Sequence, residues 1–426
     1  MPPLNLTVAA AAKITPPAMN YDTASREALV TECQRLKKRG YSGKKKSDLI
    51  AMLRGEAPAA PAATAAPAAP PAPAAPEAAP SNIHRLNYIG SKFQLLAWLD
   101  DTMRAKTGWT DFRNRRIADL FAGTGIVSAH FRQAGAVVTT NDAELYSSVI
   151  AHALTLSAYT PACAEFIAAV VADIAAGQHL ASEVGYITRV YSPHGECERM
   201  FFTVENARRI DYIRGRIEGA ELVPNDAAFL LASLLLSADA VSNVPAVYGC
   251  FLHTFKAKAE KALVFAPIHT MSEDGLGAAF SADVLGLGAA IGRHDLVYLD
   301  PPYNHRQYSK NYFPLNVIAM TQAEQEALGE LKGVTGIPPG CFASDFCKKD
   351  GVEKAFRTLV AGLNTEWIFI SYSSESLVPR EKMLELLGAF GEVSVVERDY
   401  KRFKNYEYNE DVAIKEYLFC LRKRIA

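Results

Sequence analysis

The chain has 426 residues, which exceeds one typical domain and allows a sizeable buried core. Its 45 basic and 46 acidic side chains give a formal net charge of −1, which excludes a strongly basic or acidic protein. The seven cysteines are scattered without a Cys-x-x-Cys pair, and no apolar run is long enough to cross a bilayer. We therefore expect a cytoplasmic protein with reduced thiols, no metal site and no membrane partner, because the N-terminus also lacks a secretory pattern.

The first organised unit is predicted over residues 24–55, after a disordered stretch over residues 1–23. Apolar residues recur at helical spacing in two runs that Gly40 separates, which predicts a pair of helices. Nine Lys and Arg residues outnumber three Asp and Glu residues here, so six positive charges are in excess. Such clustering is typical of a phosphate-binding surface, although a solvated basic pair or a protein-docking module is the alternative. The candidate nucleic-acid contacts are Arg39, Lys44, Lys45 and Lys46.

A spacer follows this unit. Residues 56–80 are almost wholly Ala and Pro, a composition that cannot form a packed core. An extended spacer of this kind reaches on the order of 70 Å and separates two working parts. The second part is predicted to be a large domain over residues 81–426, with an insertion over about 150–280.

A ligand-binding turn is predicted early in the large domain. An apolar strand beginning at Ile117 runs into a turn that contains Gly123 and Gly125, and residues 126–133 follow as a helix. Glycines let the backbone approach a ligand closely. The match to a dinucleotide fingerprint is incomplete, because Ser128 stands where a third glycine would be.

An acid follows the next predicted strand. This strand covers residues 137–140 and ends in Asn141 and Asp142. An acid at the tip of a second strand can hydrogen-bond ribose hydroxyls, as it does in nucleotide-binding α/β sheets. The alternative is that Asp142 caps the helix that follows it.

The insertion is predicted to be largely helical. Its helices are expected over residues 150–175, 206–217 and 227–238. Beyond them lies a loop-rich segment with aromatic residues, in which Lys256 and Lys258 fall. This composition suits contacts to a duplex, while a helical cap with a solvated lysine face is the alternative.

A second chemical motif follows the apolar run 296–299, which ends in Asp300, Pro301, Pro302 and Tyr303. An amine on an aromatic ring is a poor nucleophile, because its lone pair is delocalised into the ring. The Asp300 carboxylate and the Pro301 carbonyl can each accept one amine hydrogen, and Tyr303 can stack on a base that has left the duplex. The alternative is an ordinary strand end with a tight Pro-Pro turn.

The remaining elements complete the predicted fold. Further strands are expected over residues 367–371, 393–397 and 417–421. Strands that alternate with helices predict an α/β fold, with a mostly parallel sheet and helices on both faces.

The two motifs together carry a family resemblance. The run from Asp119 through Phe121 to Gly125, combined with the tetrapeptide at Asp300, resembles the S-adenosylmethionine-dependent amino-methyltransferases, specifically the DNA adenine-N6 methyltransferases. The resemblance spans about residues 82–424. The cofactor motif comes first and the catalytic motif follows a long insertion, which resembles the alpha-class order.

Smaller segments support this resemblance. The segment from Tyr88 to Lys92 resembles the family motif that lies against the methionine end of the cofactor. The segment that ends at Asp283 resembles the one whose acid meets the cofactor's adenine. The chain departs from the family at Phe313 and Asn316, where relatives often carry His and Glu, so details of base positioning differ.

The resemblance implies a Rossmann-like enzyme that moves a methyl group from S-adenosylmethionine to a flipped-out adenine in double-stranded DNA. A paired restriction endonuclease is a possible partner of such an enzyme. The N-terminal unit resembles the SAP module, which binds DNA with little sequence preference. The implied cofactor-binding residues are Tyr88, Lys92, Asp119, Phe121, Gly123, Gly125, Asp142 and Asp283. The implied catalytic residues are Asp300, Pro301, Pro302 and Tyr303.

Three alternatives share parts of this pattern. Cytosine-N4 methyltransferases hold their target amine in the same kind of pocket but more often carry Ser at the position of Asp300. RNA guanine methyltransferases also contain the acid-Pro-Pro-Tyr turn, although the SAP-like unit and the large insertion argue against them. A non-catalytic DNA-binding protein is the third alternative, and the intact Asp300 and Tyr303 argue against it.

Overall fold

The computed structural model describes residues 21, 25–36, 46–54, 86, 88–288, 290–400 and 414–424. The chain divides into two compact units, Met1–Glu77 and Ala78–Ala426. The predicted contacts Arg39, Lys44 and Lys45, the N-terminal stretch 1–20 and the Ala/Pro spacer lie outside the described residues.

The small unit contains the expected pair of helices. These are α1 (Arg26–Arg35) and α2 (Lys46–Arg54). The Ser25 side chain caps α1 by accepting a hydrogen bond from the Ala28 amide at 3.2 Å. Leu29 and Cys33 of α1 are buried in one cluster with Leu49 of α2, so the apolar stripes of the two helices face each other.

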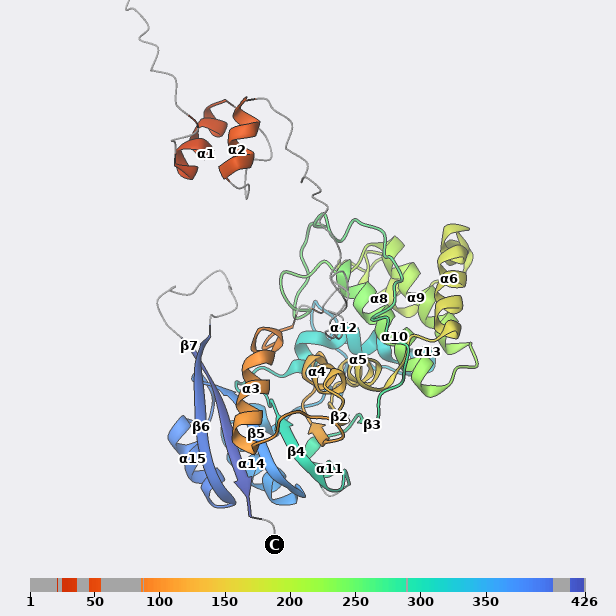
Figure 1. Cartoon of the computed structure of the whole chain (residues 1–426). Coiled ribbons are helices and arrows are strands. Elements are labelled where there is room, and N and C mark those ends of the chain that lie inside the picture. The colour runs from red at the N-terminus through yellow and green to blue at the C-terminus, as the bar shows by residue number, and fades with distance from the viewer. Residues whose placement is uncertain are drawn as a thin grey trace, which may run out of the picture. The chain divides into compact units, whose positions relative to one another are not determined.

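A seven-stranded sheet organises the large unit (Figure 1). Its strands are β1 (Arg116–Asp119), β2 (Val137–Asn141), β3 (Gly277–Phe280), β4 (His294–Leu299), β5 (Thr365–Ser373), β6 (Gly391–Tyr400) and β7 (Ile414–Lys423). Their order is β3-β2-β1-β4-β5-β7-β6. The pairs among β1 to β5 are parallel, whereas β7 is antiparallel to both of its neighbours. The sheet is therefore mixed, with β7 alone reversed.

Helices cover both faces of this sheet, because neighbouring residues of a strand point to opposite sides. On one face, Ile117 and Leu296 lie in a cluster with side chains of α3 (Leu96–Thr107) and α4 (Ile126–Gln133). On the other, Ala118 and Val297 join α11 (Val284–Leu287), α14 (Val352–Gly362) and α15 (Arg380–Gly388). The predicted α/β fold with helices on both faces is confirmed.

The insertion and the segment after β4 form a helical layer. It contains α5 (Leu145–Leu156), α6 (Pro161–Ala175), α7 (Gln178–Ala181), α8 (Tyr186–Tyr191), α9 (Val204–Glu218), α10 (Pro224–Ala240), α12 (Tyr308–Ala319) and α13 (Gln322–Glu326). Short 3₁₀ turns lie at Phe93–Leu95 and Asp345–Cys347. No helix in the described part of the chain is long and apolar enough to span a membrane.

One predicted helix is wrong. Residues 150–175 were expected to be continuous, but α5 ends at Leu156 and α6 begins at Pro161. Proline has no backbone amide, so it suits the first turn of a new helix and not the interior of an old one. The Thr160 side chain marks this start by accepting a hydrogen bond from the Cys163 amide at 3.1 Å.

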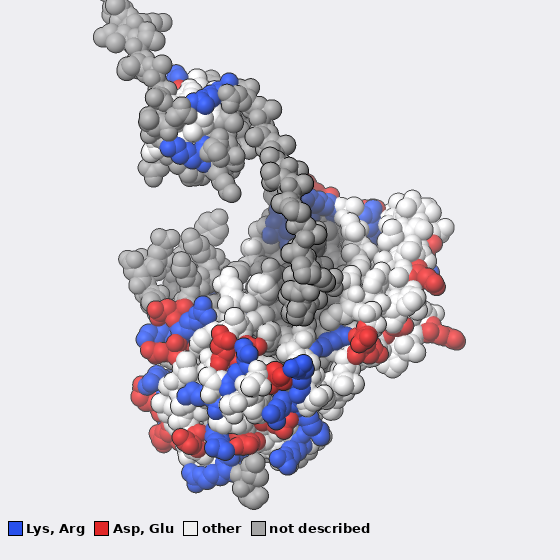
Figure 2. All heavy atoms as spheres, viewed as in Figure 1, with Lys and Arg blue, Asp and Glu red and all other residues white. Residues whose placement is uncertain are grey.

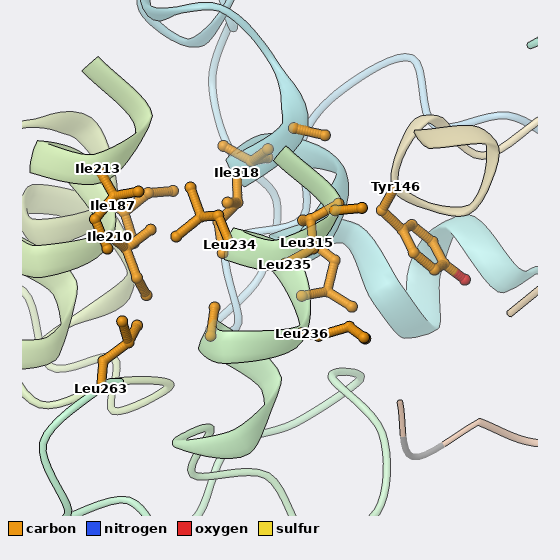
Figure 3. Packing of buried hydrophobic residues seen from close by; sticks show 14 of the residues in the cluster. Tyr146, Ile187, Ile210, Ile213, Leu234, Leu235, Leu236, Leu263, Leu315 and Ile318 are labelled. Carbon is orange, nitrogen blue, oxygen red and sulfur yellow. The ribbon is translucent and has the colours of Figure 1, made fainter. Parts of the chain in front are cut away.

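The helical layer has its own apolar core around α10. Figure 3 shows Leu234 and Leu235 of α10 beside Leu315 and Ile318 of α12, with the isoleucines of α8 and α9 on the left, all in one cluster. Leu234 and Leu235 are fully buried. This core anchors α12, the helix that follows the acid-Pro-Pro-Tyr turn.

We expect Leu235→Ala to lower the free energy of unfolding by ~2–5 kcal/mol, the range for emptying a fully packed leucine site. The matched control is Leu180→Ala, because Leu180 is 52% exposed and the same substitution there creates no cavity. Urea denaturation of both variants measures the difference. Equal losses would show that Leu235 is not part of a tightly packed core.

Candidate active site

The predicted site residues meet at one edge of the sheet. The carboxyl ends of β1, β2 and β4 lie together there, and the strand order reverses between β1 and β4. Such a switch point leaves a crevice in which α/β proteins bind ligands. A pocket at this edge is lined by Tyr88, Lys92, Asp119, Phe121, Gly123, Asp142, Asp283, Asp300, Pro301, Pro302 and Tyr303. The structure thus brings together every predicted catalytic and cofactor residue except Gly125.

The two glycines of the turn have different surroundings. Both have positive φ, +54° at Gly123 and +70° at Gly125, a conformation that favours glycine. A Cβ on Gly123 would lie 3.1 Å from the Tyr88 ring, whereas one on Gly125 would lie 2.9 Å from the Cα of Ala151. Gly123 therefore keeps the turn close to the pocket wall, while Gly125 lets α4 start against α5.

Asp119 ends β1 with a partly unsatisfied carboxylate. Its Oδ2 accepts a hydrogen bond from the Ser128 hydroxyl at 2.7 Å. Its Oδ1 is buried and has no hydrogen-bond partner in the described part of the chain. Burial raises the pKa of Asp119 to about 7, although the Ser128 hydrogen bond lowers it and the nearby Asp300 raises it further. A buried acceptor left open in a pocket is where a ligand's donor fits.

Asp142 ties the tip of β2 to the glycine turn. Its Oδ2 accepts from the Gly123 amide at 2.8 Å and its Oδ1 from the Glu144 amide at 2.9 Å. Helix α5 begins later, at Leu145, with Glu144 as its N-cap residue. Burial raises the pKa of Asp142, and the Glu144 and Gly123 amides partly offset this. A carboxylate can accept about four hydrogen bonds, so Asp142 can also accept one from a ligand hydroxyl.

Glu144 is a pocket residue that the sequence pattern did not indicate. It is 6% exposed, and its Oε2 accepts from the Asn316 side-chain amide at 2.6 Å. Burial raises the pKa of Glu144 to about 7, the Asn316 hydrogen bond lowers it and the Asp142 charge raises it. Asn316 is one of the two departures from the family pattern, and here it satisfies a buried acid.

Asp300 lies against a buried lysine. The Lys92 Nζ is 2.8 Å from Asp300 Oδ1 and 3.4 Å from Glu416 Oε1. Burial raises the pKa of Asp300 to about 6, Lys92 lowers it and Glu416 raises it. Burial alone would lower the pKa of Lys92, but Asp300 and then Glu416 raise it well above its usual range. The pair therefore favours an ionised Asp300 near neutral pH.

Tyrosines hold the segment that carries Lys92. The Tyr88 ring stacks on Tyr312 with centroids 5.1 Å apart and is tilted against Tyr308 at 5.4 Å. The Tyr312 hydroxyl accepts from the Ile89 amide at 3.0 Å, and the Tyr308 hydroxyl donates to the Ile89 carbonyl at 3.2 Å. Both backbone groups of Ile89 are thus satisfied by α12, which fixes the approach of Lys92 to the pocket.

The other predicted residues have more local contacts. The Asp283 side chain lines the pocket and caps α11 by accepting from the Leu285 amide at 3.1 Å. Lys256 Nζ donates to the Val244 carbonyl. Lys258 Nζ donates to the Asp239 carbonyl at 3.3 Å. These two lysines therefore brace a loop of the insertion, and their contact with DNA stays a prediction, as does that of the exposed Lys46.

Comparison with known proteins identifies the family. Residues 88–385 match the family described as D12 class N6 adenine-specific DNA methyltransferase. The chain is 39% identical over 339 residues to Type II methyltransferase M.CviAII of Paramecium bursaria Chlorella virus 1. The aligned region covers 79% of this chain and 98% of that protein. It is 34% identical over 356 residues to Type II methyltransferase M.NlaIII of Neisseria lactamica, with coverage of 79% and 99%. Type II methyltransferase M.FokI of Planomicrobium okeanokoites is 30% identical over 353 residues, with coverage of 80% and 53%.

The switch point of the sheet, the glycine turn and the acid-Pro-Pro-Tyr turn at one pocket match the arrangement that the resemblance to the amino-methyltransferases implies. The chain belongs to the D12 class N6 adenine-specific DNA methyltransferase family. It is a site-specific enzyme that methylates adenine N6 in DNA with S-adenosylmethionine as the methyl donor. The prediction of adenine methylation is confirmed over the cytosine, RNA and non-catalytic alternatives.

The residues present fit this donor. S-adenosylmethionine carries a sulfonium, an ammonium and a carboxylate, so its net charge is positive. The described lining of the pocket contains the acids Asp119, Asp142, Glu144, Asp283 and Asp300, and its lysine, Lys92, is paired with Asp300. Acidic side chains in a partly desolvated pocket favour a cationic ligand. The buried Oδ1 of Asp119 has no donor among the described residues, so it can accept a hydrogen bond from a ligand. Charge and hydrogen-bonding capacity therefore both match.

We expect Asp119→Asn to stabilise the ligand-free protein and to weaken donor binding. An acid whose pKa is raised to about 7 contributes stability below its unfolded pKa and loses it as the pH rises through 7. At about pH 8 the variant should gain ~1–3 kcal/mol in unfolding free energy, the scale of an unsatisfied buried group. Urea denaturation measures this gain, which should be smaller at about pH 5.

The control for this substitution is Asp111→Asn, because Asp111 is a half-buried partner of Arg113 outside the pocket. Calorimetry with S-adenosylmethionine should show weaker binding to the Asp119 variant and unchanged binding to the control. A pH-independent gain in stability, or an unchanged donor affinity, would contradict this reading of Asp119.

Proposed function

We propose that the pocket holds the donor against the β1 and β2 ends and presents the adenine amine to Asp300 and Pro301. The observation that carries this proposal is the position of Asp300, which lines the same pocket as the open carboxylate of Asp119. When bound, the donor would supply an electrophilic methyl group on its sulfonium, and a neutral thioether would be the leaving group as the C–S bond breaks, so the protein contributes position and electrostatics. Asp119 and Asp283 would bind donor amines, and Asp142 the ribose hydroxyls.

The amine would be held by two acceptors. Asp300 and the Pro301 carbonyl each accept one N–H, which directs the nitrogen lone pair away from the ring and toward the methyl group. Only an ionised Asp300 can accept through both oxygens, and Lys92 favours that form. Tyr303 would stack on the extruded base, and the amine's surplus proton would leave through Asp300 to water.

Recognition of a defined DNA sequence would fall to the insertion. The two matched relatives that this chain covers almost completely are named type II methyltransferases, which supports a short specific site and a paired restriction endonuclease. In the view of Figure 2, basic and acidic residues alternate over the part of the large unit that holds β5 to β7. Loop residues of the insertion, including Lys256 and Lys258, remain our candidates for duplex contacts.

The N-terminal unit would act as a tethered DNA contact. Its support is the basic excess in the sequence together with a two-helix core that keeps Lys46 exposed. A SAP-like unit on a long spacer raises the effective concentration of enzyme near DNA without selecting the site.

We expect Asp300→Ala to lose methyl transfer by several orders of magnitude while donor binding is kept, because the acid contacts the base and not the donor. Transfer of labelled methyl groups to duplex DNA measures the first quantity, and calorimetry the second. The control is Asp345→Ala, which removes an exposed acid paired with Lys348. Activity of Asp300→Ala within about tenfold of wild type, only ~1.4 kcal/mol, would refute the proposed role.

Deletion of residues 1–80 should raise the DNA concentration for half-maximal rate and flatten its salt dependence. The reason is that phosphate contacts release counterions, so their contribution fades as salt rises. The methylated sequence and the turnover at saturating DNA should stay unchanged. Methylation rates across DNA and salt concentrations, combined with methylation-aware sequencing, measure all four quantities.

A full-length variant with Lys44, Lys45 and Lys46 changed to Gln separates charge from length. It should show most of the effect of the deletion, because the spacer and the helices remain. Identical curves for all three proteins, or an altered recognition sequence after deletion, would rule out a nonspecific tether.

A further inference from the structure

Glu416 is a buried acid at the active site that no motif of the family resemblance includes. It lies near the start of β7, the reversed strand. Because β7 runs against β5, its first residues reach the sheet edge where β4 ends, and Glu416 pairs with Ser373 in the register of the two strands. Its side chain is 8% exposed.

Glu416 belongs to a continuous polar chain that ends at Asp300. The Ser371 hydroxyl donates to Glu416 Oε1 at 2.8 Å, and the same oxygen is 3.4 Å from Lys92 Nζ. Lys92 Nζ is in turn 2.8 Å from Asp300 Oδ1 and donates to the Gly90 carbonyl at 3.1 Å. The ammonium therefore has acceptors on three sides, each from a different part of the chain.

Glu416 is not needed to neutralise the charge of Asp300. One lysine and one aspartate would already form a neutral pair, yet a second carboxylate is buried behind the lysine. Burying an additional acid is costly unless it is paired and hydrogen-bonded, and both conditions are met here by Lys92 and Ser371. A lysine side chain is a flexible four-carbon stem, so an ammonium held by Asp300 and the Gly90 carbonyl of its own segment alone would be less firmly fixed. The second carboxylate restricts it.

We propose that Glu416, held by Ser371, is a positioning residue that fixes Lys92 against Asp300 and sets the pH range in which Asp300 can accept the adenine amine. The inference rests on the proposed role of Asp300. Glu416 itself acts through Lys92 and does not line the pocket.

The direction of the pH effect follows from the charges around Asp300. Burial raises the pKa of Asp300 to about 6, Lys92 lowers it and Glu416 raises it. Removing the Glu416 charge therefore lowers this pKa, and Asp300 stays ionised to lower pH. Among the described residues, the other titratable groups that interact with Asp300 are Asp119, Tyr298, Tyr303 and Tyr308. They remain the same in a Glu416 variant.

The test is Glu416→Gln, which keeps shape and hydrogen-bonding capacity while removing the charge. The acid limb of the pH profile of kcat, at saturating DNA and donor, should move down by about one pH unit, a usual scale for the loss of a neighbouring charge. Above neutral pH, kcat should fall by about tenfold to a hundredfold, because a loosened Lys92 misplaces Asp300. KM for DNA should stay unchanged.

Two further variants sharpen this experiment. Glu397→Gln is the matched control, because Glu397 is an exposed acid on β6 paired with Lys415, the chain neighbour of Glu416. It should leave both kcat and the acid limb unchanged. Ser371→Ala keeps the Glu416 charge and loses only its hydrogen bond, so it should lower kcat while moving the acid limb little.

A second readout does not depend on methyl transfer. Carboxyl ¹³C NMR of the ligand-free protein, with Asp300→Asn to assign the signal, reports the ionisation of Asp300 directly. Its midpoint should be lower in Glu416→Gln than in wild type and in Glu397→Gln. If this shift appears while Asp300→Ala still methylates DNA, the network stands and the proposed role of Asp300 fails.

The proposal is overturned if Glu416→Gln leaves the Asp300 midpoint and the acid limb where they are in wild type. It is also overturned if this variant lowers only the melting temperature, because a purely structural residue would do that and leave the pH profile parallel. An upward shift of the midpoint would contradict the direction of the charge effect.

Discussion

The active site depends on one buried ammonium placed between two carboxylates. Lys92 comes from the segment before the sheet, Asp300 from the end of β4 and Glu416 from the start of β7. Without the lysine, two acids would be buried close together, and at least one would be protonated near neutral pH. The pairing therefore lets a carboxylate remain an acceptor in a place that water reaches poorly.

The sheet makes this meeting possible. Parallel strands deliver their carboxyl ends to one edge, so Asp119, Asp142 and Asp300 follow three strands that need no further device to bring them together. The reversal of β7 adds Glu416 from the opposite chain direction. Helix α12 then holds Tyr88 and Ile89 through Tyr308 and Tyr312, and α12 also packs into the apolar core around α10.

The features of the active site that could be predicted from the sequence are those formed by short continuous segments. The strand-turn-helix at Gly123 and the tetrapeptide at Asp300 are short, and each requires particular residue types, so their places could be predicted. Glu416 could not be predicted, because its role comes from strand register between distant segments. The pair of Glu144 and Asn316 was missed because it depends on the packing of α12 against the start of α5, which are far apart in the sequence. The break in residues 150–175 was missed because apolar periodicity outweighed Pro161.

Several buried acids share the pocket, and their ionised forms are therefore unfavourable in the ligand-free protein. Asp119 and Glu144 have their pKa values raised to about 7 by burial, so each would be more stable in water or paired with a cation. Replacing them with neutral residues should favour the folded chain. If the pocket holds the cationic donor as proposed, these carboxylates would lower the stability of the ligand-free protein and would gain a favourable partner when the donor binds, so that donor binding would stabilise the folded chain.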